Sequence, residues 1–377
     1  MQKVIIIGSA YPYRGGLATF KEQLARVLQT EDREVEIFTF ILQYPSILFP
    51  GKTQLSDEPA PSDLKITRAV NSINPLNWII VGNKIKKLKP DLVIFKFWIP
   101  FISLCFGTIA RIIKKNKHTK VIAITDNVIP HEKRPFDNQL IQYFVNSCDG
   151  FISMSDTVLK DLEQFNTSKP MFLTPHPLYS NFGEIIPKQS AKERLNLDPN
   201  FNYLLFFGFI RAYKGLDLLL KAFANEKLRN LQLKLIVAGE YYENPEPYQK
   251  IIAENNLQDH IILKDEFVPN SDVQKYFCAA DIIVQPYKSA TQSGVTQIAY
   301  HFNKPMIVTN VGGLPEMVPN EKVGYVVNQD PEEIAEAIYK FYNEKKEDFF
   351  VSGVMEEKKK YGWDIFVHKI EELYKTI

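Results

Sequence analysis

The stretch that decides the fold is residues 203–224, YLLFFGFIRAYKGLDLLLKAFA. Its apolar run from Tyr203 to Phe207 is typical of a buried parallel strand, and Gly208 ends that run. Apolar residues then recur with the 3.6-residue period of an amphipathic helix, at Leu216, Leu219, Leu220 and Phe223. The stretch therefore predicts a strand, a short turn and a helix.

The turn between this strand and this helix carries two cations, Arg211 and Lys214. In α/β proteins, ligands bind where the carboxyl ends of parallel strands meet the following helices. Two positive side chains three residues apart at such a turn favour a diphosphate group. A solvated basic loop is the alternative interpretation.

Length and composition indicate an ordinary globular protein. A chain of 377 residues predicts two domains, and 45% hydrophobic with 24% charged residues argues against disorder. The three cysteines have no metal-ligand spacing, so we expect reduced thiols and a cytoplasmic protein. The first apolar run is too short for a signal peptide. The longest one, residues 97–113, contains Pro100 and Arg111 and is too short to cross a bilayer.

Strand and helix patterns alternate on both sides of the central stretch, which predicts two doubly wound parallel sheets. We expect a first domain at residues 1–180, a linker at 181–189 and a second domain at 190–361. The amphipathic segment 362–377 is expected to form a helix that crosses back onto the first domain. The predicted strands are residues 3–9, 34–40, 63–70, 91–97, 120–127, 150–155, 171–177, 203–207, 233–240, 260–268, 281–287, 305–313 and 324–327.

The first strand is followed by Gly15 and Gly16, just before a predicted helix. Two glycines at a helix start expose backbone N–H groups and let a ligand oxygen approach closely. The spacing is not that of a Rossmann dinucleotide site. A tight turn without a ligand is the alternative.

Four segments in this order resemble the GT-B glycosyltransferases of the retaining family 4 (glycosyl transferases group 1) type: YPYRGG, FFGFIRAYKGLDLLLKAF, CAADIIVQPY and KPMIVTNVGGLPEMV. The resemblance covers nearly the whole chain. It implies two Rossmann-like domains facing across a cleft, with a nucleotide sugar bound mainly by the second and an acceptor mainly by the first. Arg211 and Lys214 match the family's basic pair on the donor diphosphate.

Metal chemistry is not expected. The chain contains no Asp-x-Asp motif, which in other glycosyltransferases holds a divalent cation on the diphosphate. In the enzymes that this chain resembles, a pair of positive side chains neutralises the charge that grows on the leaving nucleoside diphosphate. Arg211 and Lys214 match that pair. We therefore expect a metal-independent transferase with no cofactor.

The chain departs from the family where two glutamates normally contact the donor. An alignment anchored on Pro286 and Pro305 places Ala290 and Ile298 at those positions. Neutral side chains and the N–H groups of a helix start are the expected replacements. An ordinary helix cap at Ser293 is the alternative. These donor-side residues are Gln292, Ser293, Gly294, Val295 and Gln297.

A second departure concerns a family histidine that follows the strand in KVIAITDN. Asp126 holds the matching position, and His131 follows five residues later. Either residue could orient the donor sugar or accept a hydrogen bond from the acceptor. A surface histidine paired with Glu132 and an Asx turn at Asp126 are the alternatives.

Three further residues of the second domain are expected near the donor. Gly208 ends the strand that leads into the basic turn. Val268 resembles the loop whose backbone contacts the nucleotide base, and Glu316 follows a strand on the donor side. A helix N-terminal glutamate without a ligand is the alternative for Glu316.

Charge is distributed unevenly. Residues 1–180 hold 22 Lys+Arg against 16 Asp+Glu, whereas residues 181–377 hold 23 against 28. Basic residues beside apolar area suit an anionic membrane surface, although a solvated basic face is the alternative. We expect a glycan or polyprenyl-linked saccharide acceptor at the inner face of the membrane, and no nucleic acid. The residues are Lys84, Lys86, Lys87, Lys89, Lys114, Lys115 and Lys117, with Tyr44, Ile47, Leu48 and Phe49.

The predicted function is transfer of a hexose-type sugar from a nucleoside diphosphate to a hydroxyl group, in cell-surface polysaccharide biosynthesis. Two alternatives are a sugar-nucleotide epimerase or hydrolase on the same fold, and a non-catalytic or regulatory sugar-nucleotide-binding protein. An epimerase would need carboxylates placed for proton abstraction, and few candidates exist.

Overall fold

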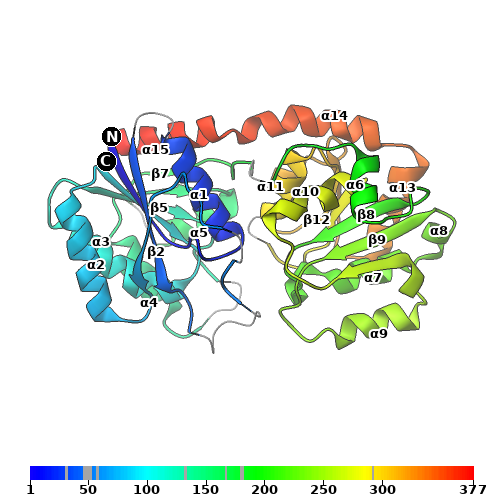
Figure 1. The fold of residues 1–377 in the computed structure, drawn as a ribbon, viewed down its shortest axis with the longest axis horizontal. Coiled ribbons are helices and arrows are strands. Elements are labelled where there is room, and N and C mark those ends of the chain that lie inside the picture. Colours follow the sequence, from blue (N-terminus) through cyan, green and yellow to red (C-terminus); the bar gives the residue numbers. More distant parts are fainter. Residues whose placement is uncertain are drawn as a thin grey trace. The chain divides into compact units, whose positions relative to one another are not determined.

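The computed structural model describes residues 1–29, 33–45, 53–56, 59–130, 134–165, 168–178, 182–290 and 293–377. The chain divides into two compact units, Met1–Pro177 with Tyr361–Ile377 (unit 1) and Leu178–Lys360 (unit 2). Each unit is a parallel β-sheet flanked by helices (Figure 1). The predicted α/β fold with two doubly wound sheets is confirmed. Lys188 and Gln189, which the sequence places in the linker, begin a helix.

In unit 1 the described residues form a seven-stranded sheet of order β3-β2-β1-β4-β5-β6-β7, in which all neighbours are parallel. The order reverses between β1 and β4, the switch point where ligands bind in such sheets. The elements are β1 (Lys3–Ile7), α1 (Gly16–Gln29), β2 (Glu34–Leu42), β3 (Ile66–Asn71), α2 (Pro75–Leu88), β4 (Leu92–Phe97), α3 (Ser103–Lys114), β5 (Lys120–Thr125), α4 (Asp137–Val145), β6 (Gly150–Ser153), α5 (Asp156–Glu163), β7 (Met171–Leu173) and α15 (Trp363–Thr376).

The core of unit 1 follows from its apolar strands. Val4 to Ile7 in β1 are fully buried, as expected for a strand covered by helices on both faces. Phe95 of β4, Phe106 of α3 and Phe144 of α4 contact one another, with ring centroids 5.0 to 6.1 Å apart. Such aromatic contacts fix α3 and α4 against the sheet.

The C-terminal helix α15 packs within unit 1. Trp363 and Phe366 lie against Phe20 of α1, with ring centroids 5.3 and 5.7 Å away. Phe366, Val367, Ile370 and Leu373 are buried, whereas Ile365, an apolar residue of the same amphipathic segment, is 38% exposed. The helix therefore turns a slightly different face inward than its apolar pattern indicates.

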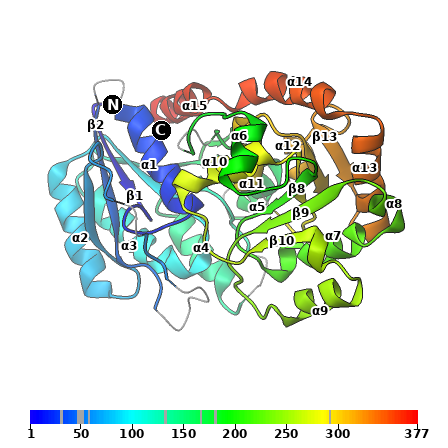
Figure 2. The same cartoon turned by 45° about the vertical axis from the view of Figure 1, so that its right-hand side comes forward.

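In unit 2 the described residues form a six-stranded parallel sheet of order β10-β9-β8-β11-β12-β13. Its order reverses between β8 and β11, and Figure 2 shows β8, β9 and β10 side by side. The elements are α6 (Lys188–Arg194), β8 (Asn202–Phe207), the 3-10 turn η3 (Ala212–Lys214), α7 (Leu216–Phe223), α8 (Glu226–Arg229), β9 (Leu233–Ala238), α9 (Glu246–Glu254), β10 (Ile261–Lys264), α10 (Asn270–Ala279), β11 (Ile282–Gln285), α11 (Gly294–His301), β12 (Met306–Thr309), α12 (Leu314–Met317), β13 (Gly324–Val327), α13 (Pro331–Asn343) and α14 (Glu347–Glu357).

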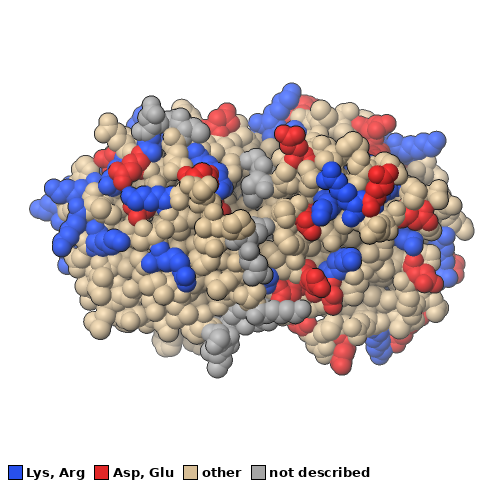
Figure 3. Space-filling view, viewed as in Figure 1, with Lys and Arg blue, Asp and Glu red and all other residues tan. Residues whose placement is uncertain are grey.

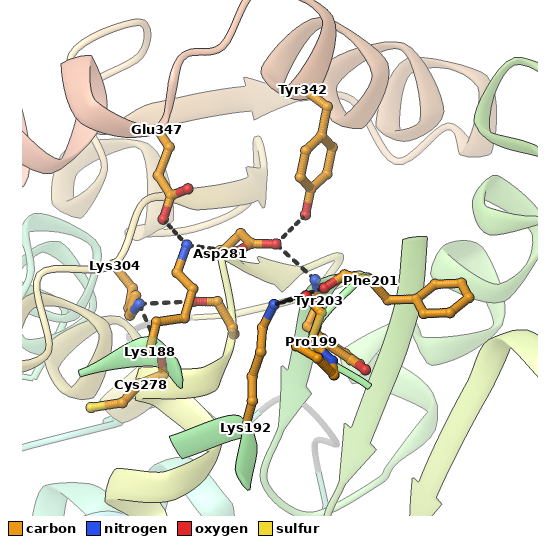
Figure 4. Close-up of polar contacts among 11 residues, drawn as sticks. Lys188, Lys192, Pro199, Phe201, Tyr203, Cys278, Asp281, Lys304, Tyr342 and Glu347 are labelled. Atoms are coloured by element: carbon orange, nitrogen blue, oxygen red, sulfur yellow. Dashed lines mark hydrogen bonds and ion pairs between the residues drawn. The ribbon is translucent and has the colours of Figure 1, made fainter. Parts of the chain in front are cut away.

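A buried polar network joins the elements of unit 2 at the amino ends of β8 and β11 (Figure 4). Asp281, which is 2% exposed, accepts hydrogen bonds from Lys188 Nζ at 2.7 Å and from the backbone N–H of Tyr203 at 2.7 Å. Tyr342 of α13 donates to the same carboxylate at 3.2 Å, and Lys188 also pairs with Glu347 of α14. One carboxylate thereby connects two helices with the sheet.

Candidate functional site

The predicted basic turn of unit 2 follows β8, at the switch point of its sheet. After Arg211 the chain makes the 3-10 turn η3, and Gly215 then precedes the first residue of α7 as its N-cap. Gly215 has φ +68°, and a Cβ atom there would lie 1.9 Å from the carbonyl oxygen of Pro286, so only glycine fits. The backbone N–H of Lys288 donates to the carbonyl of Tyr213 at 2.6 Å. These contacts hold the basic turn against the segment that follows β11.

Lys214 lies at the meeting point of β8 and α11. Its Nζ is 3.1 Å from the position that a Cβ of Gly208 would occupy, and Val295 Cγ2 is 3.8 Å from the same position. Gly208 therefore leaves the space that the ammonium group fills. Burial lowers the pKa of Lys214, and no described side chain pairs with its Nζ, which is 5.4 Å from the ring centroid of Tyr287. The Lys214 side chain is half-buried, and an ammonium group there without a carboxylate partner favours an anionic ligand.

The helix α11 begins beside this ammonium group and has no side-chain cap in the described chain. The hydroxyl of Ser293 donates to Gln285 Oε1 at 2.6 Å and makes no capping hydrogen bond. The alternative of an ordinary cap at Ser293 is therefore wrong. The first N–H groups of α11, starting at Gly294 and Val295, are left for a ligand, and the helix dipole favours negative charge there.

Gln297 is the fourth residue of α11. It is fully buried, and neither its amide nitrogen nor its amide oxygen has a hydrogen-bond partner among the described residues. Such an unsatisfied amide is costly in a folded protein, and functional sites are one place where it occurs. The matched positions Ala290 and Ile298 are buried as well, with 9% and 6% exposure.

Arg211, at the start of the basic turn, contacts an aromatic ring. Its guanidinium carbon is 5.0 Å from the ring centroid of Tyr242, close enough for a cation–π contact. Tyr242 in turn packs on Phe209 at 4.3 Å, and Phe267 stacks on Phe209 at 6.1 Å. This aromatic group covers the carboxyl ends of β8, β9 and β10. No sequence pattern indicates this aromatic group, because its three residues belong to three separate loops.

The other donor-side predictions are spread over unit 2. Val268 is half-buried in the loop after β10, next to Phe267 of the aromatic group. Glu316 is exposed in the short helix α12. Gln292 lies outside the described residues. The described structure thus brings Gly208, Lys214 and the start of α11 together.

In unit 1, Asp126 follows β5 and is held by a lysine of the neighbouring strand. Lys96 of β4, which is 2% exposed, donates to Asp126 Oδ1 at 2.7 Å. Lys96 Nζ also lies 3.4 Å from the ring centroid of Phe20. Burial lowers the pKa of Lys96, and Asp126 opposes that shift. The ion pair keeps the Asp126 carboxylate, whose side chain is 19% exposed, in one place.

A second buried lysine lies close to this ion pair. Lys21 of α1 is fully buried against Gly8, and its Nζ has no hydrogen-bond partner among the described residues. Burial, with a contribution from the charge of Lys96, lowers the pKa of Lys21 well below its usual range. Sequence analysis missed both lysines. Lys96 stands inside the apolar run LVIFKF, which indicates a buried charge. The run does not indicate which residue pairs with that charge.

His176 completes the cluster and is expected to make the stability of unit 1 depend on pH. Its ring lies 5.1 Å from Phe20, and Nδ1–H donates to the carbonyl of Pro177 at 2.8 Å. Burial, aided by the charge of Lys96, lowers the pKa of His176 from 6.5 to about 4. Below pH 6.5 the unfolded chain takes up a proton that the folded chain refuses until about pH 4, so stability falls as pH falls through this window.

The expected effect is about 1.4 kcal/mol per pH unit, or roughly 3 kcal/mol in all. Urea unfolding of the wild type and of His176→Gln at several pH values measures it. The free energy of unfolding of the wild type, relative to the variant, is expected to fall from pH 7 toward pH 4. A difference that does not change with pH would contradict the assignment to His176.

The glycines of unit 1 lie at the same switch point. Gly15 has φ +94° and Gly16 begins α1, whose first turn has no acidic residue. His131 lies outside the described residues, as do Ile47, Leu48 and Phe49 of the predicted membrane loop. Within the described ranges, no group of three or more His, Cys, Asp or Glu side chains is placed to hold a metal ion.

Several known proteins are similar to this chain in sequence. Residues 202–344 match the family model described as glycosyl transferases group 1. A D-inositol 3-phosphate glycosyltransferase of Pseudarthrobacter chlorophenolicus is 28% identical over 144 residues, which cover 37% of this chain and 34% of that protein. Three such curated relatives are covered over 34% to 45% of their own length. An uncharacterized glycosyltransferase of Methanocaldococcus jannaschii is 23% identical and matches over 100% of this chain and 99% of its own.

A solved structure extends the likeness to the whole fold. The Anabaena protein HepE in complex with UDP and glucose superposes with a TM-score of 0.75 at 13% identity, covering 100% of both chains. At this identity the likeness is one of fold. The family model and the relatives show that the chain is similar in sequence to glycosyltransferases, and the solved structure shows a common fold with two parallel sheets.

Proposed function

We propose that the protein is a metal-independent, retaining glycosyltransferase that uses a nucleoside-diphosphate sugar. The observation that carries this proposal is the half-buried Lys214, whose ammonium group lies beside Gly208 and the uncapped start of α11, at the carboxyl ends of β8 and β11. A fixed positive charge and unpaired backbone N–H groups suit a diphosphate. The solved complex of HepE with UDP and glucose supports a nucleotide-sugar donor for this fold.

In the proposed reaction, the bond between the anomeric carbon and the diphosphate oxygen breaks, and the acceptor hydroxyl oxygen forms a bond to that carbon. The hydroxyl proton passes to a diphosphate oxygen. Lys214 and the amides of α11 stabilise the negative charge that appears on the leaving group. Arg211, held at Tyr242, supplies a second positive charge at the rim of the same turn. Attack from the face that the leaving group departs from would retain the anomeric configuration.

The acceptor is proposed to be a hydroxyl group of a glycan or polyprenyl-linked saccharide, in cell-surface polysaccharide biosynthesis at the inner face of the membrane. Asp126, fixed by Lys96, is the residue of unit 1 proposed to accept a hydrogen bond from a sugar hydroxyl. No helix in the described part of the chain is long and apolar enough to span a bilayer. The basic excess of the first half supports a peripheral contact.

Thermal unfolding tests both the donor and the absence of a metal. In buffer with EDTA, one sugar among UDP, GDP, ADP and TDP conjugates is expected to raise the melting temperature, because a ligand bound only by the native state adds stability. Lys214→Ala should abolish most of this increase. An increase that appears only with Mg²⁺ would contradict metal independence, and no increase with any nucleotide sugar would contradict the proposed donor.

One observation favours a second function, a sugar-nucleotide-binding protein without turnover. The positions matched to the family glutamates, Ala290 and Ile298, are apolar and buried, so they offer the donor sugar no carboxylate. Incubation with the stabilising nucleotide sugar and a membrane extract distinguishes the transferase from the binding protein. Release of nucleoside diphosphate supports the transferase, and binding without release supports the binding protein.

A further inference from the structure

The outward face of α2 in unit 1 is apolar, although a surface helix is normally polar on that side. Leu76 and Ile80, one turn apart, are 71% and 66% exposed, and Ile79 is 47% exposed. The opposite side of the helix is also apolar, since Trp78 and Val81 are buried against the core. A helix that is apolar all round is normally covered all round. The outward side of α2 therefore lacks a cover within the described chain.

The same face becomes basic toward the end of the helix. Lys84 and Lys87 are exposed and continue the row of Leu76 and Ile80 at helical spacing. Residues 73–118 contain nine Lys and Arg but one acidic residue, Asp91. That carboxylate already accepts hydrogen bonds from the backbone N–H groups of Gln2 and Lys3 and contacts His118. Two of the nine are paired, since Lys96 is buried against Asp126 and Lys114 pairs with Asp149, whereas Lys84 and Lys87 make no ion pair among the described residues.

A second helix extends this surface. α3 packs beside α2, as Figures 1 and 2 show, and ends near the exposed residues Lys115 and Lys117. Figure 3 shows basic side chains gathered at the upper left, over unit 1, and a surface free of charged side chains below them. Cationic and uncharged areas thus adjoin on one side of unit 1.

We propose that this α2 face, made of Ile73, Leu76, Ile79, Ile80, Lys84 and Lys87, docks on an anionic lipid bilayer. The apolar side chains would enter the boundary between headgroups and acyl chains, while the lysines reach back to lipid phosphates. Charge complementarity selects a bilayer over a second copy of this chain, because the lysines of two copies would face each other. The proposal rests on the proposed function, since a lipid-linked acceptor gives the contact its purpose.

Flotation of the full chain with vesicles tests the proposal. Wild type is expected to float with phosphatidylglycerol vesicles and not with phosphatidylcholine vesicles, and added salt should weaken the binding. Leu76→Ser with Ile80→Ser should lower the partition coefficient roughly 10- to 100-fold, because two apolar side chains no longer insert. Lys84→Gln with Lys87→Gln should lower it about 25-fold, at about fivefold for each lysine.

The matched control lies in unit 2. Phe349 and Met355 of α14 are 59% and 49% exposed, and their replacement by serine is expected to leave flotation unchanged. Equal flotation of wild type with both vesicle types, or wild-type flotation of the Leu76 and Ile80 variant, would overturn the proposal. So would a dimer in gel filtration that only this variant abolishes, since a second copy would then be the cover.

The nucleotide-sugar thermal shift distinguishes this inference from the proposed function. The α2 variants are expected to keep the full shift, because the α2 face belongs to unit 1 and the donor residues Gly208 and Lys214 belong to unit 2. Flotation without any nucleotide shift would support the surface and contradict the donor. A nucleotide shift without flotation would support the donor and overturn the surface.

Discussion

Replacing Lys214 by alanine is expected to lower kcat for sugar transfer by about 10²- to 10³-fold. This is the usual cost of removing one group that stabilises charge developing in the transition state. The ammonium group lies beside Gly208 and the start of α11, and no described carboxylate neutralises it. Initial rates of nucleoside diphosphate release at saturating donor measure kcat directly.

Two control measurements distinguish a loss of catalysis from a general loss of charge or of folding. Lys221→Ala removes an exposed cation of the adjoining helix α7 and is expected to leave kcat unchanged. Urea unfolding of Lys214→Ala should show no loss of stability, because partial desolvation of an ammonium group without a carboxylate partner opposes folding. A well-folded Lys214→Ala enzyme with the kcat of wild type would remove Lys214 from the mechanism.

Replacing Asp281 by alanine is expected to lower the free energy of unfolding of unit 2 by about 3–5 kcal/mol, the usual cost of breaking a buried ion pair from one side. The variant leaves the backbone N–H of Tyr203 and the hydroxyl of Tyr342 without their acceptor, and it removes one of the two carboxylates on Lys188 (Figure 4). Urea unfolding followed by circular dichroism measures the change.

A surface ion pair of the same unit provides the control. Glu336 pairs with Lys227, and the two side chains are 55% and 58% exposed. Because water screens exposed pairs, Glu336→Ala should cost at most about 1 kcal/mol. If Asp281→Ala cost no more than this control, the network around Asp281 would not be what joins α6, α13 and α14 to the sheet.

Sequence periodicity predicted the elements of the fold well, and its errors have identifiable causes. The central stretch formed strand β8, a short turn and helix α7 nearly at the predicted bounds. The predicted strand at residues 260–268 shrinks to Ile261–Lys264, an edge strand that pairs with β9. The residues that follow, Asp265 and Glu266, are exposed. An apolar run does not reveal where a strand loses its neighbour.

The candidate site was likewise predicted only in part from the sequence. Lys214 could be selected from sequence because two cations follow an apolar strand at a glycine. In the structure the two cations have different contacts: Lys214 lies beside Gly208 and the start of α11, and Arg211 lies on the ring of Tyr242. Gln285, which draws the Ser293 hydroxyl away from a capping role, was not foreseen. Gln285 is the polar last residue of the otherwise apolar strand β11. Its hydrogen-bond partner is determined by the residues that pack against it in the folded chain.

The sequence by itself determined where strands, turns and helices lie, because apolar period and glycine position act over a few neighbouring residues. Tertiary structure decided which charges meet: Lys96 with Asp126, 30 positions apart, and Lys188 with Asp281, 93 positions apart. Such pairs depend on strand order, which local period does not encode. For the same reason, the burial of Lys21 and the exposure of Leu76 became evident only once the chain was folded.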